Sequence, residues 1–121
     1  MIILYRTGGD RMLNASDILR GYTDTIILAQ LREKDNYGYQ ISKSVADISG
    51  GVLELKEGTL YTTFRRLENT GLIESYWGDE QAGARRRYYR LTEKGRETLK
   101  DNLEDWKRYA SLLERILSRE V

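Results

Sequence analysis

The 121-residue sequence contains neither cysteine nor histidine. Without cysteine the chain forms no disulfide and no thiolate metal site, and without histidine it lacks the commonest general base and the commonest transition-metal ligand. No glycine-rich loop of the kind that cradles phosphate is present either. Most catalytic constellations are therefore excluded. We expect a protein that is not an enzyme and that holds neither a cofactor nor a metal ion.

Long hydrophobic runs are also missing. The apolar opening at residues 1–5 is far too short to span a membrane, and no small-residue cleavage site of a signal peptide accompanies it. We therefore expect a soluble, cytoplasmic protein without a membrane partner. A chain of 121 residues with 40% hydrophobic content is the right size for one domain with its own core.

Net charge is equally scarce, with 20 Lys and Arg against 19 Asp and Glu. The overall charge thus offers no argument for nucleic-acid binding. The distribution is more informative, because residues 56–96 carry nine basic and six acidic side chains. Residues 1–55 and 97–121 each carry one more acid than base. The positive excess coincides with the two motifs described next.

The first motif is a helix expected to begin at Glu57 and to end at Gly71. Leu60, Phe64 and Leu67 follow i, i+4, i+7 spacing, so they share one face and point into a core. The opposite face is rich in Arg, Thr and Tyr, which suit base edges and phosphates in a major groove. An ordinary solvated helix is the alternative. The residues assigned to DNA are Thr59, Tyr61, Thr62, Arg65 and Arg66.

The second motif is a β-hairpin, with strands expected at about residues 73–77 and 86–91 and a polar, glycine-flanked turn over residues 78–84. Three consecutive guanidinium groups stand at this turn, where a protruding wing would bring them to phosphates or a minor groove. The alternative is that they only solubilise an exposed strand edge. The three residues are Arg85, Arg86 and Arg87.

Two further helices are expected before these motifs. Residues 1–15 are interpreted as an N-terminal arm. From Ser16, a good N-cap, apolar spacing predicts a first helix that stops near Lys34. A second helix is expected from about Tyr37 to Ile48, ended by two glycines. Residues 16–92 thus predict a winged helix-turn-helix DNA-binding domain, a mainly α fold of the α+β class.

Residues 93–121 predict one long C-terminal helix, capped by Thr92, running to about Ser118 and about 39 Å long. Its apolar residues are spaced 4, 3, 4, 3, 4, which is typical of a coiled-coil seam and indicates a homodimer. The apolar face is broad enough to suit packing on the chain's own domain as well. The predicted dimer residues are Leu99, Leu103, Trp106, Ala110, Leu113 and Leu117.

Three side-chain groups admit more than one role. Trp77 and Trp106 suit core or interface anchors, but a Trp near a dimer axis can also stack on a flat aromatic effector. The acidic run Asp101, Glu104 and Asp105 is interpreted as a solvated face, because its spacing does not guarantee convergent oxygens for a metal ion.

Three stretches of the chain resemble PadR-type transcriptional regulators, in a match that covers about residues 17–117. Residues 37–41 look like the Gly-Tyr-x-Ile start of the family's second helix, and residues 57–61 with 65–73 are similar to its recognition helix. Residues 83–95 closely resemble the family's wing, Gly-x-x-[Arg/Lys]-[Arg/Lys]-Tyr-Tyr-x-[Leu/Ile]-Thr-x-x-Gly. Each piece alone is moderately specific, and the order and spacing together are highly specific.

The resemblance implies a homodimeric repressor of a pseudo-palindromic operator in double-stranded DNA, usually near its own gene or a transporter or enzyme gene. The single C-terminal helix looks like the small subfamily, in some members of which aromatic drugs stack on a Trp between two long helices. Trp106 stands at the corresponding place and is the candidate contact for a small aromatic effector. Thr62 and Lys56 replace the family's usual Pro and Ser. Because Thr62 faces outward, the base preference of relatives does not transfer.

Two rival functions remain open at this point. A winged-helix module that binds protein instead of DNA is consistent with the near-zero net charge. A DNA-binding regulator controlled by abundance or by a partner protein would need no small effector. The absence of salt-dependent DNA binding would favour the first, and a failed screen of aromatic compounds would favour the second.

Overall fold

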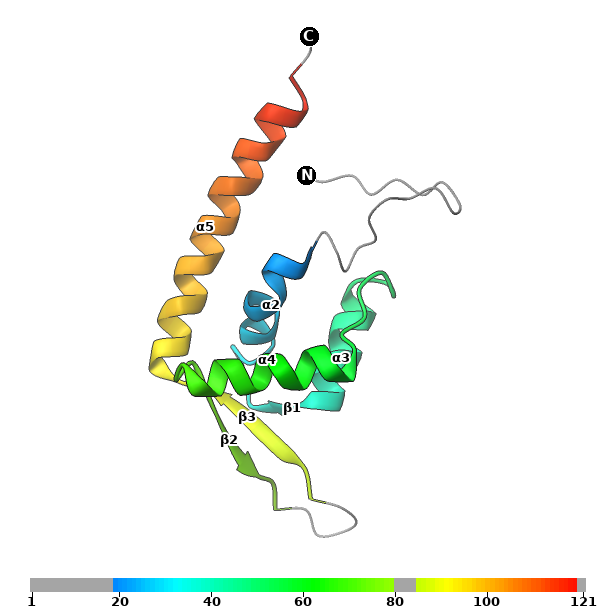
Figure 1. Ribbon diagram of the computed structural model, residues 1–121, viewed down its shortest axis with the longest axis vertical. Coiled ribbons are helices and arrows are strands. Elements are labelled where there is room, and N and C mark those ends of the chain that lie inside the picture. Colours follow the sequence, from blue (N-terminus) through cyan, green and yellow to red (C-terminus); the bar gives the residue numbers. More distant parts are fainter. Residues whose placement is uncertain (1–18, 80–84, 120–121) are drawn as a thin grey trace.

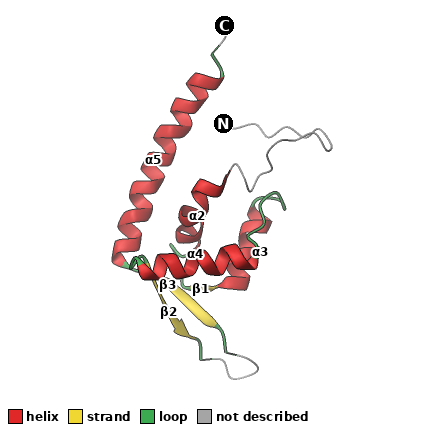
Figure 2. Ribbon diagram, viewed as in Figure 1, coloured by secondary structure: helices red, strands yellow, loops and turns green. Residues whose placement is uncertain are grey.

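The structure is a computed structural model that describes residues 19–79 and 85–119. Three helices lie over a small antiparallel sheet with strand order β1-β3-β2, and a fourth, much longer helix rises along one side (Figure 1; Figure 2). This arrangement is the expected winged helix-turn-helix with a long C-terminal helix. The elements are η1 (Arg20–Tyr22), α2 (Thr23–Gln30), β1 (Asn36–Tyr37), α3 (Gly38–Ile48), α4 (Glu57–Asn69), β2 (Ile73–Trp77), β3 (Arg87–Leu91) and α5 (Glu93–Leu117).

The hydrophobic core lies between α4, the other helices and one face of the sheet. Leu60, Phe64 and Leu67 of α4 are all buried, which confirms the orientation predicted from their spacing. Phe64 stacks on Tyr89 of β3 with 3.9 Å between ring centroids. This contact fixes the hairpin under α4. The other buried apolar residues are Ile27, Leu28, Leu31, Ile41, Val45, Leu53, Leu55, Ile73, Leu91 and Leu99.

The predicted helix ends and strands are confirmed for α3, α4 and the hairpin. After α4, Gly71 adopts a positive φ of 78°, a conformation that favours glycine. The Gly71 and Leu72 amides donate to the carbonyls of Glu68 and Leu67, which closes the helix end. At the start of α5, the Thr92 hydroxyl accepts from the Gly95 amide at 3.0 Å, so the predicted cap is present.

The first predicted helix is wrong in extent. The described part begins with a single 3₁₀ turn, η1, and α2 then ends at Gln30 instead of near Lys34. Leu31, directly after α2, is the last buried side chain of this segment, and the charged residues 32–34 that follow it are exposed. No core contact therefore holds a further turn. The expected cap at Ser16 and the arm at residues 1–15 lie outside the described residues.

A third strand, β1, was not predicted. It contains only Asn36 and Tyr37, which pair with Tyr89 and Tyr88 of β3. Two residues are too few for any hydrophobic periodicity to reveal a strand. Through this strand the start of α3 is tied to the wing.

Candidate nucleic-acid interface

The outward side of α4 carries the five residues that the sequence assigned to DNA. Thr59, Tyr61, Thr62, Arg65 and Arg66 are all exposed, while the core residues occupy the opposite side. The helix therefore presents a polar and basic surface on one side, while its opposite side is packed against the hydrophobic core. Such a helix offers hydrogen-bond donors to base edges and phosphates alike.

The two arginines of α4 differ in their surroundings. The guanidinium of Arg66 forms an ion pair with Asp24 of α2. Within residues 19–79 and 85–119, no hydrogen bond or ion pair engages the Arg65 side chain. Arg65 thus keeps its whole planar fork of donors for an outside partner, whereas Arg66 is held toward α2.

Tyr61 joins α4 to the start of α3. Its ring lies edge-on to Phe64, with centroids 5.5 Å apart. A Cβ at Gly38 would lie 2.7 Å from the Tyr61 hydroxyl oxygen, so a larger residue there would displace the Tyr61 side chain from its present position. The α3 start, including the exposed Tyr39, is therefore placed beside the outward side of α4.

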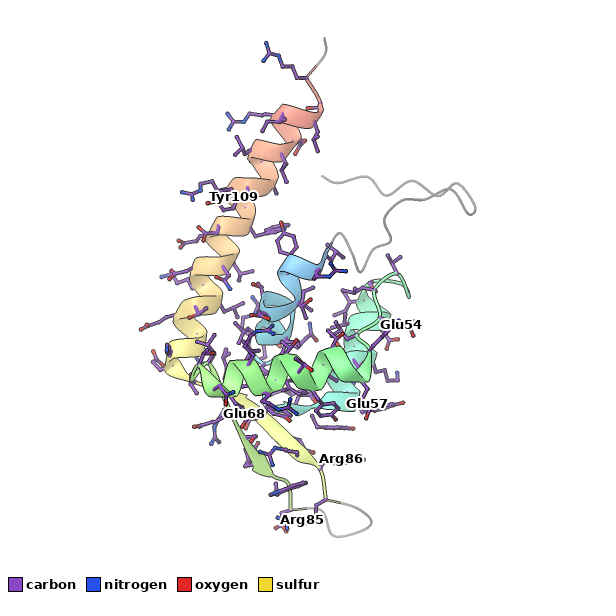
Figure 3. All side chains as sticks on the ribbon, in the orientation of Figure 1. Glu54, Glu57, Glu68, Arg85, Arg86 and Tyr109 are labelled. Carbon is purple, nitrogen blue, oxygen red and sulfur yellow. The ribbon has the colours of Figure 1, made fainter. Side chains whose placement is uncertain are left out.

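The wing presents its arginines on aromatic rings. The guanidinium carbons of Arg85 and Arg87 each lie 5.5 Å from the Trp77 ring centroid, and that of Arg86 lies 4.7 Å from the Tyr37 ring. Arg85 and Arg86 stand at the far end of the described hairpin, away from the helices (Figure 3). Stacking restrains a flat guanidinium while leaving its edge donors available to phosphates.

Arg87 has a second, internal partner. It lies 3.9 Å from a carboxylate oxygen of Glu68 at the end of α4, and the same oxygen accepts from the Ser75 hydroxyl at 2.8 Å. Glu68 therefore links the last turn of α4 to both strands of the wing. Through Glu68, Arg87 helps to hold the hairpin against the helix.

The outer face of the sheet carries three tyrosines that the sequence analysis did not single out. Tyr37, Tyr88 and Tyr76 lie side by side on β1, β3 and β2, with ring centroids 5.5 and 5.8 Å apart. Their only sequence signal was the aromatic enrichment expected of strands. Together they form a cross-strand row that stiffens the base of the wing.

Charged residues flank the tyrosine row. The Tyr76 hydroxyl donates to the Asp35 carboxylate at 2.5 Å, and this hydrogen bond, with a smaller contribution from burial, raises the pKa of Tyr76. The Arg90 guanidinium donates to the Glu74 carboxylate at 3.0 Å, and this hydrogen bond is the main cause of the raised pKa of Arg90. Another nitrogen of the same guanidinium lies 3.9 Å from a carboxylate oxygen of Asp35. Arg90 is therefore held against the sheet by these two carboxylates. In the core, burial raises the pKa of Tyr89.

The predicted dimer residues fall into two groups. Leu99 belongs to the chain's own hydrophobic core and Leu103 packs against that core while partly buried. Trp106, Leu113 and Leu117 are exposed, and Ala110 is partly buried. The structure thus brings Leu99 into the domain, where it has almost no surface left for a partner.

Two other features, a metal-ligand cluster and a membrane-spanning helix, are absent from the described residues. Among residues 19–79 and 85–119, no three Asp, Glu, His or Cys side chains gather as ligands for a metal ion. In the same part of the chain, no helix combines the length and the apolar character needed to cross a membrane.

Comparison with known families agrees with this geometry. Residues 27–101, which run from within α2 through α3, α4 and the described wing to the first part of α5, match the profile described as the transcriptional regulator PadR-like family. The chain belongs to this family. The family is one of transcription regulators.

Solved structures show the same relationship. A transcriptional regulator from Clostridium thermocellum is 43% identical, with a TM-score of 0.77 over 85% of this chain and 97% of that one. A PadR family regulator from Clostridium difficile is 38% identical, with a TM-score of 0.72 over 81% and 100%. PadR of Bacillus subtilis, solved in complex with operator DNA, is 25% identical, with a TM-score of 0.61 over 67% and 47%.

Proposed function

We propose that this PadR-family chain is a homodimeric repressor that binds operator DNA through α4 and the wing. The observation that carries the proposal is the outward side of α4, where every assigned side chain is exposed and Arg65 has no partner among the described residues. The complex of the B. subtilis relative with operator DNA supports the same use of the fold. In a dimer, two α4 helices would enter successive major grooves about 34 Å apart.

The surroundings of each residue on α4 and the wing indicate whether it would contact bases or phosphates. Arg65, with Thr62 beside it, would read base edges, since a planar fork suits the two acceptors of guanine. Thr59, Tyr61 and Arg66 would hydrogen-bond phosphates along the groove. Arg85, Arg86 and Arg87 would grip the flanking backbone, with Arg87 contributing least because Glu68 already engages it. These contacts neutralise several phosphates, so the affinity should fall with salt.

The second half of α5 would form the dimer contact. Its exposed apolar side chains continue the 4, 3, 4 spacing of a coiled coil from Trp106 onward. Pairing two such helices would bury these side chains at the dimer axis. The dimer surface proposed is Trp106, Ala110, Leu113 and Leu117, with Leu103, which partly packs on the chain's own core, at its edge.

Trp106 would also be the contact for a small aromatic effector. Its side chain is 46% exposed, and in a coiled-coil dimer it would face its counterpart across the axis. An aromatic compound that stacks there would alter the crossing of the two α5 helices and so the separation of the two α4 helices. A few kcal/mol of differential affinity between the two arrangements suffices for release from DNA.

Fluorescence anisotropy tests the DNA-binding proposal. The protein is titrated onto the DNA upstream of its own gene and onto a shuffled duplex, at several salt concentrations. We expect tighter binding to the upstream DNA and a steep loss of affinity with salt. Equally weak, salt-insensitive binding to both duplexes would contradict the proposal and favour a winged helix that binds protein.

Arg65→Ala should cost about 1–3 kcal/mol of binding to the preferred DNA and relax its sequence preference, because a bidentate base contact is lost. Arg115→Ala is the matched control, since Arg115 is an exposed arginine on α5 far along the chain from the reading surface. An equal effect of both variants would show that only overall charge matters.

Trp106→Ala tests the effector. We expect the variant to lose release by aromatic compounds while keeping nearly native affinity for DNA. A Trp77→Phe background leaves Trp106 as the only tryptophan, so that quenching of its fluorescence reports the compounds directly. Equal loss of DNA affinity and of release would instead mark Trp106 as a dimer anchor, and quenching by no compound in the panel would contradict the effector site.

A further inference from the structure

A shallow hollow of about 310 Å³ lies between α4 and the turn that begins α2. The α4 side of the hollow belongs to the outward side of α4 that is assigned to DNA. The other side comes from η1 and the start of α2, to which no role has been assigned. Its polar lining consists of Arg20, Thr23, Thr59, Thr62, Thr63 and Arg66.

The lining has the chemistry of a phosphoryl site. It contains two guanidinium groups and four threonines, and it contains no carboxylate. Guanidinium forks match the oxygens of a phosphate, and the exposed hydroxyls of Thr59 and Thr62 supply further donors. The Thr23 hydroxyl donates instead to the Arg20 carbonyl at 3.1 Å, which ties α2 to η1. Asp24, which follows Thr23 in the chain, pairs with Arg66 but does not line the hollow. Asp24 thus draws Arg66 toward the α2 side of α4.

The position of the hollow relative to α4 also suits a DNA backbone. Thr59 and Arg66 lie toward α2, at the hollow, whereas Tyr61 lies toward the start of α3. These are the two flanks of the outward side of α4. A helix in a major groove, which is about 12 Å wide, has a phosphate backbone along each flank. The hollow lies where one of these two backbones would pass.

We propose that the hollow binds a backbone phosphoryl group of the DNA, with Arg20 as the contact from η1 beside Thr59 and Arg66 of α4. This inference rests on the proposed function and adds to it a second point of attachment, on the flank of α4 away from α3. Asp24 is a positioning residue, because it holds Arg66 at the rim of the hollow.

The test compares Arg20→Ala with Arg32→Ala in the salt titrations. Both arginines are exposed, one before and one after α2. The two variants therefore remove the same charge from opposite ends of the same helix. For Arg20→Ala we expect a loss of about 3- to 10-fold on operator and shuffled duplex alike, and a decrease of about one in the slope of log affinity against log salt. Arg32→Ala should change neither. Arg20→Lys keeps the charge and should restore the slope.

The possible outcomes separate this inference from the proposed function. Native protein without salt-dependent DNA binding would overturn both. Native binding that Arg20→Ala leaves unchanged in affinity and slope would overturn the DNA contact alone. Thermal unfolding of the variant checks that its fold is intact.

A second arm identifies the source of the phosphoryl group. Inorganic phosphate at millimolar concentration is titrated into native protein and Arg20→Ala, with amide NMR shifts of η1 and α4 as the readout. Shifts that depend on Arg20, together with unchanged DNA binding in the variant, would assign the hollow to a free phosphorylated compound and overturn the backbone contact. Loss of DNA affinity with the predicted change in slope supports it.

Discussion

The two halves of α5 share one apolar spacing but differ in what covers them. In the first half, Leu99 is 3% exposed and lies in the core, and Leu103 packs against that core. In the second half, Trp106 is 46% exposed and Leu117 is 67% exposed. Tyr109 likewise stands on the part of the helix that extends past the other elements (Figure 3).

The hydrogen bonds of α5 show the same division. In the first half, Asn102 donates to the Thr25 hydroxyl of α2 at 3.0 Å, and Arg96 donates to the Arg32 carbonyl at 3.1 Å. In the second half, Arg108 donates to the neighbouring Tyr109 hydroxyl at 2.8 Å. One heptad-like stripe therefore serves two purposes: its first part attaches the helix to the domain, and its second part is open to a partner.

The largest effect is expected for Leu99→Ala. Removing a buried leucine side chain should lower the free energy of unfolding by about 2–5 kcal/mol, because it leaves a cavity in the core. Leu117→Ala should have much less effect on the domain and should instead alter how the urea midpoint of unfolding depends on protein concentration. Urea unfolding at several protein concentrations measures both quantities. Similar results for the two variants would remove the distinction between the halves.

Leu113→Asp should separate the proposed dimer into folded monomers. A carboxylate at an apolar interface is poorly compensated, so dimerisation should weaken about 100-fold, or roughly 2.7 kcal/mol. Sedimentation velocity measures the change, and circular dichroism checks that the domain remains folded. Ser111→Asp places the same charge on an exposed polar position nearby and should leave the dimer intact. A Leu113→Asp protein that still sediments as a dimer would show that another surface joins the subunits.

The smallest effect is expected for Asn102→Ala, which removes the hydrogen bond between the first half of α5 and Thr25. The loss should be about 1 kcal/mol in the free energy of unfolding, a typical net contribution of one hydrogen bond. Arg108→Ala removes only exposed contacts within α5, to Tyr109 and Asp105, and should change stability by less than about 0.5 kcal/mol. Chemical denaturation measures the loss of stability in both variants. A larger loss for Arg108→Ala than for Asn102→Ala would contradict this comparison.

Most of the fold followed from local patterns. The i, i+4, i+7 spacing of Leu60, Phe64 and Leu67 set the buried side of α4, and Gly71 marked its end. Aromatic and apolar runs placed the hairpin strands. These features depend on residues close together in the chain, so a single sequence carries them.

What the sequence did not reveal depends on distant residues. The Arg66–Asp24 and Tyr76–Asp35 pairs join residues 42 and 41 positions apart, and no local pattern predicts such contacts. For the same reason all three wing arginines looked equivalent, although Glu68 engages Arg87. The seam of α5 was regular throughout its length, and only the position of α2 shows that Leu99 belongs to the core.

Amide hydrogen exchange along α5, measured above and below the concentration at which a dimer would dissociate, tests most directly the claim that the second half of this helix is covered by a partner. We predict that the first half, around Leu99, is protected at both concentrations, because it packs on its own domain. The second half, from Trp106 to Leu117, should be protected only at the high concentration. Protection of the second half that does not change on dilution, or that is absent at both concentrations, would contradict the account.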